Sequence, residues 1–114
     1  MYALTAAAHI DALTRLGRGL ADPIRARLLI ALREAPGYPA DLAQELGISR
    51  TRLSNHLACL RGCGLVVATP VGRRVRYELA DARLGHALDV IQITVDTVEA
   101  DQRRLGDAEG NSCP

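Results

Sequence analysis

The stretch LGISRTRLSNHLACLRGCGL, residues 46–65, decides the fold, because it combines a tight turn with one amphipathic helix. Ser49 is a suitable N-cap residue, since its hydroxyl can accept a hydrogen bond from a free backbone N–H of the first turn. Gly64 can adopt the left-handed conformation that ends a helix. Between them, three leucines spaced by four and three residues share one buried face: Leu53, Leu57 and Leu60. We therefore predict a helix that begins after Ser49 and ends before Gly64.

The segments on either side of this helix predict a winged helix-turn-helix, a mainly α-helical fold with a small β-hairpin as its wing. A short helix comes before it, and a turn that contains Gly47 joins the two. After it, Val75, Tyr77 and Leu79 alternate with charged residues, which is the period of a half-buried strand. In chain order we expect helices over residues 3–16, 23–34, 40–46 and 50–63, strands over residues 65–69 and 74–79 with a tip at residues 70–73, and a last helix over residues 82–105, with Asp22 and Asp81 as further caps.

The last helix carries an apolar seam of the kind that packs one helix against another. Its members step by four, three, four and three positions: Leu84, Leu88, Ile91, Val95 and Val98. The seam is longer than so small a domain can cover by itself, so we expect a homodimer formed through the first and last helices. Residues 1–105 would then form one domain and residues 106–114 a flexible tail.

The composition narrows the class of protein. The chain has 114 residues, a formal net charge of +1 and no apolar run of membrane-spanning length. No signal peptide is evident, so we expect a cytoplasmic protein without a membrane partner. The three cysteines, an odd number, argue against a disulfide scaffold and leave metal or redox chemistry open.

Basic residues are concentrated in one part of the chain. Residues 46–77 contain six arginines and no acidic residue, which is typical of a nucleic-acid-binding face. We expect Arg73 and Arg74 of the wing to contact the DNA backbone independently of sequence. His56 would pack against the wing or contact a phosphate. The predicted DNA-binding side chains of the central helix are Ser49, Arg50, Thr51, Arg52, Ser54, Asn55 and His56.

Two thiols, those of Cys59 and Cys63, are four residues apart near the end of the central helix and therefore lie on one face. Side chains at this spacing are about 6 Å apart, close enough to share one thiophilic ion such as Cd(II) or Pb(II), and As(III) would also accept thiolates. The alternative is that both are small packing residues. Further ligands could come from Cys113, from water, or from the carboxylates Asp96, Glu99 and Asp101.

With the order of elements in place, the chain resembles the ArsR/SmtB family of metal-responsive repressors. The likeness rests on LADPIRARLLIAL, LAQELGISRTRLSNHLACLRGCGLV and GRRVRYELAD. It implies a homodimer that binds double-stranded operator DNA, an inverted repeat, without metal and releases it when metal binds. The run LACLRGCGLVVAT and the preceding Tyr38–Pro39 are similar to a branch of cadmium and lead sensors within the family.

That branch implies a metal site made of two cysteines on the recognition helix, which correspond to Cys59 and Cys63, and a third from the C-terminal region of the other subunit. The family's third cysteine falls near Asp101, where this chain has no thiol. Cys113 lies further along the tail and is the predicted third ligand, with Asp101 possible instead. Cd(II) or Pb(II) would act as inducer, with no organic cofactor.

Other sites and other chemistries fit the sequence less well. A zinc or cobalt site on the last helix would need a second histidine beside His86, and residues 24–34 lack the Cys-x-Cys of another group of sensors. A thiol-redox switch remains a second hypothesis, although cysteines one helical turn apart have awkward geometry for a disulfide. A thiol enzyme would need a Cys-x-x-Cys motif or an evident base, so we expect no enzymatic activity.

Overall fold

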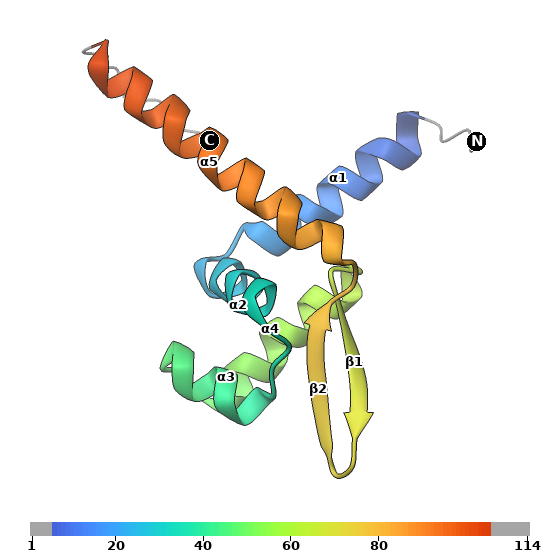
Figure 1. The fold of residues 1–114 in the computed structure, drawn as a ribbon. Coiled ribbons are helices and arrows are strands. Elements are labelled where there is room, and N and C mark those ends of the chain that lie inside the picture. Colours follow the sequence, from blue (N-terminus) through green and yellow to red (C-terminus); the bar gives the residue numbers. More distant parts are fainter. Residues whose placement is uncertain (1–5, 106–114) are drawn as a thin grey trace.

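The computed structural model of the chain describes residues 6–105. Figure 1 shows three helices and a hairpin forming the body, from which the first and last helices project. The predicted winged helix-turn-helix is confirmed. The predicted tail at residues 106–114 and the start of the predicted first helix lie outside the described residues. The elements are α1 (Ala6–Leu20), α2 (Pro23–Glu34), α3 (Pro39–Leu46), α4 (Arg50–Gly62), β1 (Val66–Val71), β2 (Arg74–Leu79) and α5 (Ala82–Arg104).

Leucines from α2, α3 and α4 form the core of the body. Because the helices supply them at spacings of three and four residues, one face of each helix is buried and the opposite face stays in water. The start of β1 and the first turns of α5 close the core at the base of the wing. The most deeply buried side chains are Leu28 and Leu29 of α2 and Leu53, Leu57 and Leu60 of α4.

Three side chains cap the helices as the sequence predicts. Asp22 accepts hydrogen bonds from the first free backbone N–H groups of α2 at 2.8 and 3.1 Å, and Ser49 Oγ accepts one from α4 at 3.1 Å. Asp81 accepts one from α5 at 2.8 Å. The guanidinium of Arg83 also donates to the Asp81 carboxylate, and it lowers the pKa of Asp81 to about 2. These caps fix where the helices around the core begin.

The first helix is longer than predicted. The expected end at residue 16 is wrong, because α1 continues through Gly17 and Gly19 to Leu20. Gly19 is buried, and a Cβ atom there would lie only 2.3 Å from Leu65 Cδ1. The glycine therefore marks a close approach of α1 to the segment that follows α4, where the sequence suggested a helix end.

The wing is a two-stranded antiparallel hairpin whose register runs from Val66↔Leu79 to Val71↔Arg74. Pro70 lies inside β1 rather than in the tip, so the predicted tip of residues 70–73 is wrong and the turn is tighter. Proline is tolerated there because each strand of a lone hairpin has a free edge. Gly72, with φ 62°, makes the turn.

Apolar side chains remain exposed on the two projecting helices. The Cα radius of gyration is 16.6 Å, whereas a compact domain of this size has about 13 Å. The first part of the predicted seam, Leu84 and Leu88, packs into the protomer's own core. The later part, Ile91, Val95 and Val98, is 40–56% exposed. Ile10 and Leu13 of α1 and Val90 and Ile93 of α5 are exposed as well.

Within residues 6–105, none of the helices combines the length and the apolar character that crossing a membrane requires.

Gly47, in the turn between α3 and α4, has φ +70°, and a Cβ atom there would meet no other atom within 4 Å. We expect Gly47→Ala to lower the free energy of unfolding by about 1 kcal/mol. The cost comes only from placing a residue with a Cβ atom in the left-handed backbone conformation. Gly62→Ala is the matched control, since Gly62 is helical and equally uncrowded. It should raise stability, by up to about 1 kcal/mol. Urea unfolding of both variants measures the difference, and equal effects would contradict the argument.

Candidate functional site

Helix α4 presents a polar face to solvent because its leucine face is locked in the core. Leu53 and Leu60 are 0% exposed and Leu57 is 1% exposed, so the helix cannot turn about its axis without opening the core. The side chains on the other side of the first turns are therefore directed into water. The exposed ones are those that the sequence assigns to DNA: Ser49, Arg50, Thr51, Arg52, Ser54 and Asn55.

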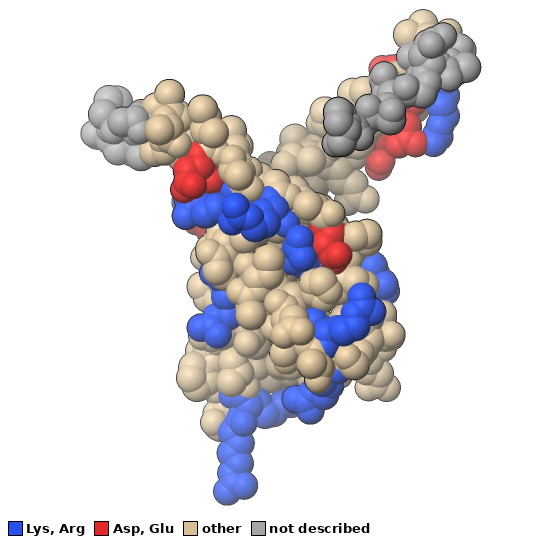
Figure 2. Space-filling view, turned by 180° about the vertical axis from the view of Figure 1, so that it is seen from behind, with Lys and Arg blue, Asp and Glu red and all other residues tan. Residues whose placement is uncertain are grey.

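The charge on this part of the molecule is positive. In Figure 2 the lower edge carries basic residues and no acidic ones, whereas the acidic residues visible on this face lie over its middle and upper parts. Arg50, Arg52 and Arg73 have no ion-pair or hydrogen-bond partner for their guanidinium groups among the described residues. These cations are therefore free to bind an anion.

His56 lies apart from the other predicted DNA-binding residues. Its side chain is only 16% exposed, and its Nδ1 lies 3.8 Å from Oδ2 of Asp22, the N-cap of α2. This position turns the imidazole toward the body of the protein. We therefore do not include His56 among the residues proposed to contact DNA.

Arg74 of the wing is not a free cation. Its Nη2 donates to Asp41 Oδ2 at 3.1 Å, and its guanidinium carbon lies 3.7 Å from the centre of the Tyr38 ring. The sequence does not indicate the contact of Arg74 with Tyr38 and Asp41, because Arg74 and Asp41 are 33 positions apart and share no local pattern.

The two thiols lie where α4 ends. Cys59 is half-buried in the last turn of α4, and Cys63 is the C-cap residue, buried at 6% exposure. The backbone N–H of Cys63 donates to the carbonyl oxygen of Cys59 at 3.0 Å, which fixes the two residues one helical turn apart. Two sulfur atoms on one turn could supply part of the ligand set of a soft metal ion.

The described residues of one protomer do not form a complete metal site. Among them, no group of three His, Cys, Asp or Glu side chains could hold a metal ion. The carboxylates of Glu99 and Asp101 pair with Arg103 and Arg104 of the same helix. Figure 1 shows α5 running away from α4 toward its C-terminal end. Cys113 lies outside the described residues. A third ligand from the described part of α5 would therefore have to come from another copy of the chain.

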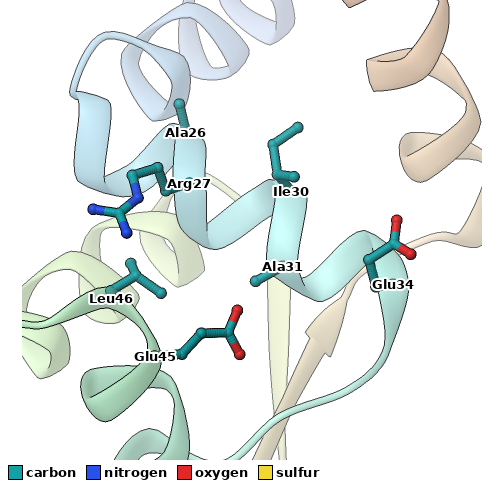
Figure 3. A pocket seen from close by; sticks show the side chains of 7 residues that line it. All are labelled: Ala26, Arg27, Ile30, Ala31, Glu34, Glu45 and Leu46. Carbon is teal, nitrogen blue, oxygen red and sulfur yellow. The ribbon is translucent and has the colours of Figure 1, made fainter.

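A groove of about 390 Å³ between α2 and α3 does not resemble a ligand site of this kind. Its charged side chains, Arg27, Glu34 and Glu45, are spread along it and do not converge on one point (Figure 3). Between them the lining is aliphatic, with Ile30 and Leu46 among the residues. No thiol or imidazole lines it, so we do not assign the metal to this groove.

Comparisons with known proteins find relatives over most of the chain. Residues 22–67 match the family described as "Bacterial regulatory protein, arsR family". The HTH-type transcriptional regulator CmtR of Mycobacterium tuberculosis is 54% identical over 99 residues, which are 87% of this chain and 84% of that protein.

Two solved structures are similar to this one. The NMR structure of the cadmium metal-sensor CmtR from Mycobacterium tuberculosis has 60% sequence identity and a TM-score of 0.60, covering 67% of this chain and 79% of that one. A homodimeric winged helix-turn-helix DNA-binding domain from Mycobacterium bovis, a possible ArsR-family regulator, has 28% identity and a TM-score of 0.74. That match covers 84% of this chain and 91% of the other.

The unequal burial of the two thiols predicts unequal reactivity in the metal-free protein. With Cys113→Ser as background, the variant that keeps only Cys59 should react readily with a chromogenic disulfide reagent. The variant that keeps only Cys63 should react slowly until denaturant is added, because its thiol is reached only through local unfolding. Absorbance stopped-flow at several urea concentrations measures both rates. A faster reaction at Cys63 would mean that the end of α4 is packed differently.

Proposed function

Because the chain belongs to the ArsR family of bacterial regulatory proteins, we propose that it is a transcriptional repressor that releases DNA when a thiophilic metal binds Cys59 and Cys63. One observation carries the proposal. The two thiols lie at the end of the same helix whose first turns present the free arginines. A ligand that displaces one end of a rigid helix displaces the other end with it. The proposal includes no enzymatic activity and no organic cofactor.

The inducer we propose is Cd(II) or Pb(II). Thiolates prefer large soft ions, and the pair at Cys59 and Cys63 offers two of them on one helical turn. The related protein described as a cadmium metal-sensor has 60% identity to this chain over the aligned residues, which supports cadmium as the first metal to test. As(III) remains an alternative inducer, because it too binds thiolates.

We propose a homodimer as the DNA-binding form, formed through the projecting helices α1 and α5. Exposed side chains such as Ile10, Leu13, Ile93 and Val95 would otherwise leave a large apolar surface in water. Two copies of α4, related by twofold symmetry, fit successive major grooves of an inverted repeat whose half-sites lie about one helical turn apart. Such a regulator would act in the cytoplasm.

Within this dimer, the chain's own residues explain how metal and DNA oppose each other. Leu53, Leu57 and Leu60 make α4 move as one body with its protomer. Donors from the partner's C-terminal region would tie the end of α4 to the dimer helices and hold the two basic faces at a spacing that fits DNA poorly. The coupling is reciprocal, so DNA should weaken metal binding by the same factor.

The third ligand we propose is Cys113 of the partner subunit, with Asp101 of the partner subunit as the alternative. Asp101 would first have to give up its pairing with Arg104, whereas a thiol matches the preference of Cd(II) or Pb(II) directly.

Replacing either helix cysteine should separate DNA binding from release. We expect Cys59→Ser and Cys63→Ser to bind an operator duplex, selected from random DNA with the metal-free protein, as the unaltered protein does. Cd(II) should weaken binding of the unaltered protein about ten- to a hundredfold and leave both variants bound, because the thiolate pair is lost. Ala58→Ser, at the exposed position next to Cys59, is the matched control and should still release.

Fluorescence anisotropy of the labelled duplex provides the measurement. Release of both cysteine variants by Cd(II) would overturn the metal site. The same assay with peroxide in place of Cd(II) tests a redox switch, which would release DNA without metal and recover it with reductant.

Counting thiolates per metal tests the third ligand. Cd(II) titration of the unaltered protein should give the ultraviolet thiolate-to-metal absorption of three sulfur ligands per site. Cys113→Ser should give two, with weaker binding, because a carboxylate or water replaces the third sulfur. Asp101→Asn serves as control and should leave the count unchanged. Two thiolates per site in both the unaltered protein and Cys113→Ser would remove Cys113 from the site.

A further inference from the structure

The wing is attached to the start of α3 at two points along β2. Near the base, Gly37 N–H donates to Tyr77 O at 2.9 Å, and Tyr77 N–H donates back to Gly37 O at 2.7 Å. Near the tip, Arg74 reaches Tyr38 and Asp41. Two attachments three residues apart on one strand fix both the position and the direction of the hairpin relative to α3.

The tip attachment uses the guanidinium of Arg74 on two sides. Its face lies over the Tyr38 ring, 3.7 Å from the centroid, and its edge donates to the Asp41 carboxylate at 3.1 Å. Planar, delocalised guanidinium suits this combination of stacking and directed hydrogen bonding. The ion pair alone is weak, since both side chains are more than half exposed. The neighbouring ring and the backbone pairing at Gly37 restrict the geometry further.

This attachment brings cations from two elements to one place. A hollow of about 230 Å³ is lined by the start of α3, by Arg50 at the first position of α4, and by Arg73 and Arg74 at the wing tip. Arg74 is already paired with Asp41, whereas Arg50 and Arg73 have no partner for their guanidinium groups in the part of the chain that the structure describes. No acidic side chain lines the hollow. Two unpaired cations facing one hollow complement one anionic group.

We propose that Tyr38 and Asp41 are positioning residues for DNA binding: they hold Arg74, and through it the wing tip, so that Arg73 and Arg50 share one phosphate of the DNA backbone. This inference rests on the proposed function, because it assumes that α4 faces duplex DNA. In this arrangement Arg74 holds the wing, and the other two arginines bind the phosphate. Without the tip attachment the hairpin would be held to α3 only near its base, and the shared contact would be lost although no charge had changed.

Tyr38 allows a test at constant charge. Tyr38→Leu removes the ring under Arg74, and Tyr38→Phe keeps it. Binding of a labelled duplex of mixed sequence by the metal-free full chain is measured over a series of salt concentrations. We expect Tyr38→Leu to weaken binding about fivefold and to lower the slope of log K against log salt concentration by about one, the value of one phosphate. Tyr38→Phe should match the unaltered protein in both.

A double-mutant cycle with Arg73 makes the test specific. Arg73→Gln should also lower the slope by about one in the unaltered background, but by nothing further when combined with Tyr38→Leu, because both remove the same contact. Arg61→Gln, a charge-matched change in the last turn of α4, should have the same effect on the slope in both backgrounds. Thermal unfolding of the two Tyr38 variants checks that both fold. If Tyr38→Leu does not fold, Asp41→Ala, which removes the other partner of Arg74, takes its place in the cycle.

The outcomes separate this inference from the proposed function. An unchanged salt slope in Tyr38→Leu, equal losses in Tyr38→Leu and Tyr38→Phe, or a full Arg73→Gln effect in the Tyr38→Leu background would overturn the role of Tyr38. Cd(II) should still release Tyr38→Leu from its operator, because both thiols are intact. Failure of the unaltered protein to bind any duplex would overturn the proposed function and this inference together.

Discussion

The burial of one leucine face of α4 is the constraint on which the rest of the structure depends. Leu53, Leu57 and Leu60 are almost completely buried, and replacing one such leucine by alanine costs about 2–5 kcal/mol in a protein whose whole stability is about 5–15 kcal/mol. Turning the helix by one residue, about 100°, would bury arginine and expose leucine. The orientation of α4 is therefore fixed, and with it the direction of the basic side chains at its start and of the thiols at its end.

Much of this follows from local sequence, because helix faces and caps depend on residues within about one turn of each other. The leucine spacing predicts the buried face of α4, and Asp22, Ser49 and Asp81 mark the helix starts that the structure confirms. Features set by distant partners could not be predicted in this way. The first helix continues past the predicted end at residue 16, and Gly19 in this extension packs against Leu65, which is 46 positions away. Equally, nothing near Arg74 indicates that its guanidinium lies on Tyr38.

The same rigidity limits how a metal at Cys59 and Cys63 could affect DNA. A helix whose side chains are locked in the core does not bend at a small cost, so the signal has to change where the whole body sits relative to the dimer helices. Several contacts connect the body to those helices, among them the packing of Leu88 of α5 in the core. Gly19 of α1 lies against Leu65, just beyond the thiols, and Arg33 of α2 pairs with Asp89 of α5 at 2.5 Å. A metal held between α4 and the partner's C-terminal region would put strain on these contacts.

The wing is attached to the body formed by α2, α3 and α4, so it would move together with that body. Its pairing through Gly37 and Tyr77 and the contact of Arg74 with Tyr38 fix it to α3, which packs directly on α4. One protomer therefore offers DNA a single rigid surface made of helix and wing together. For such a surface, affinity for an isolated half-site changes little when metal binds, and affinity for the full inverted repeat depends on how the two copies are spaced. In the proposed dimer, metal control would then reside in the interface between the two copies, although both cysteines of the described chain lie on α4 and its C-cap.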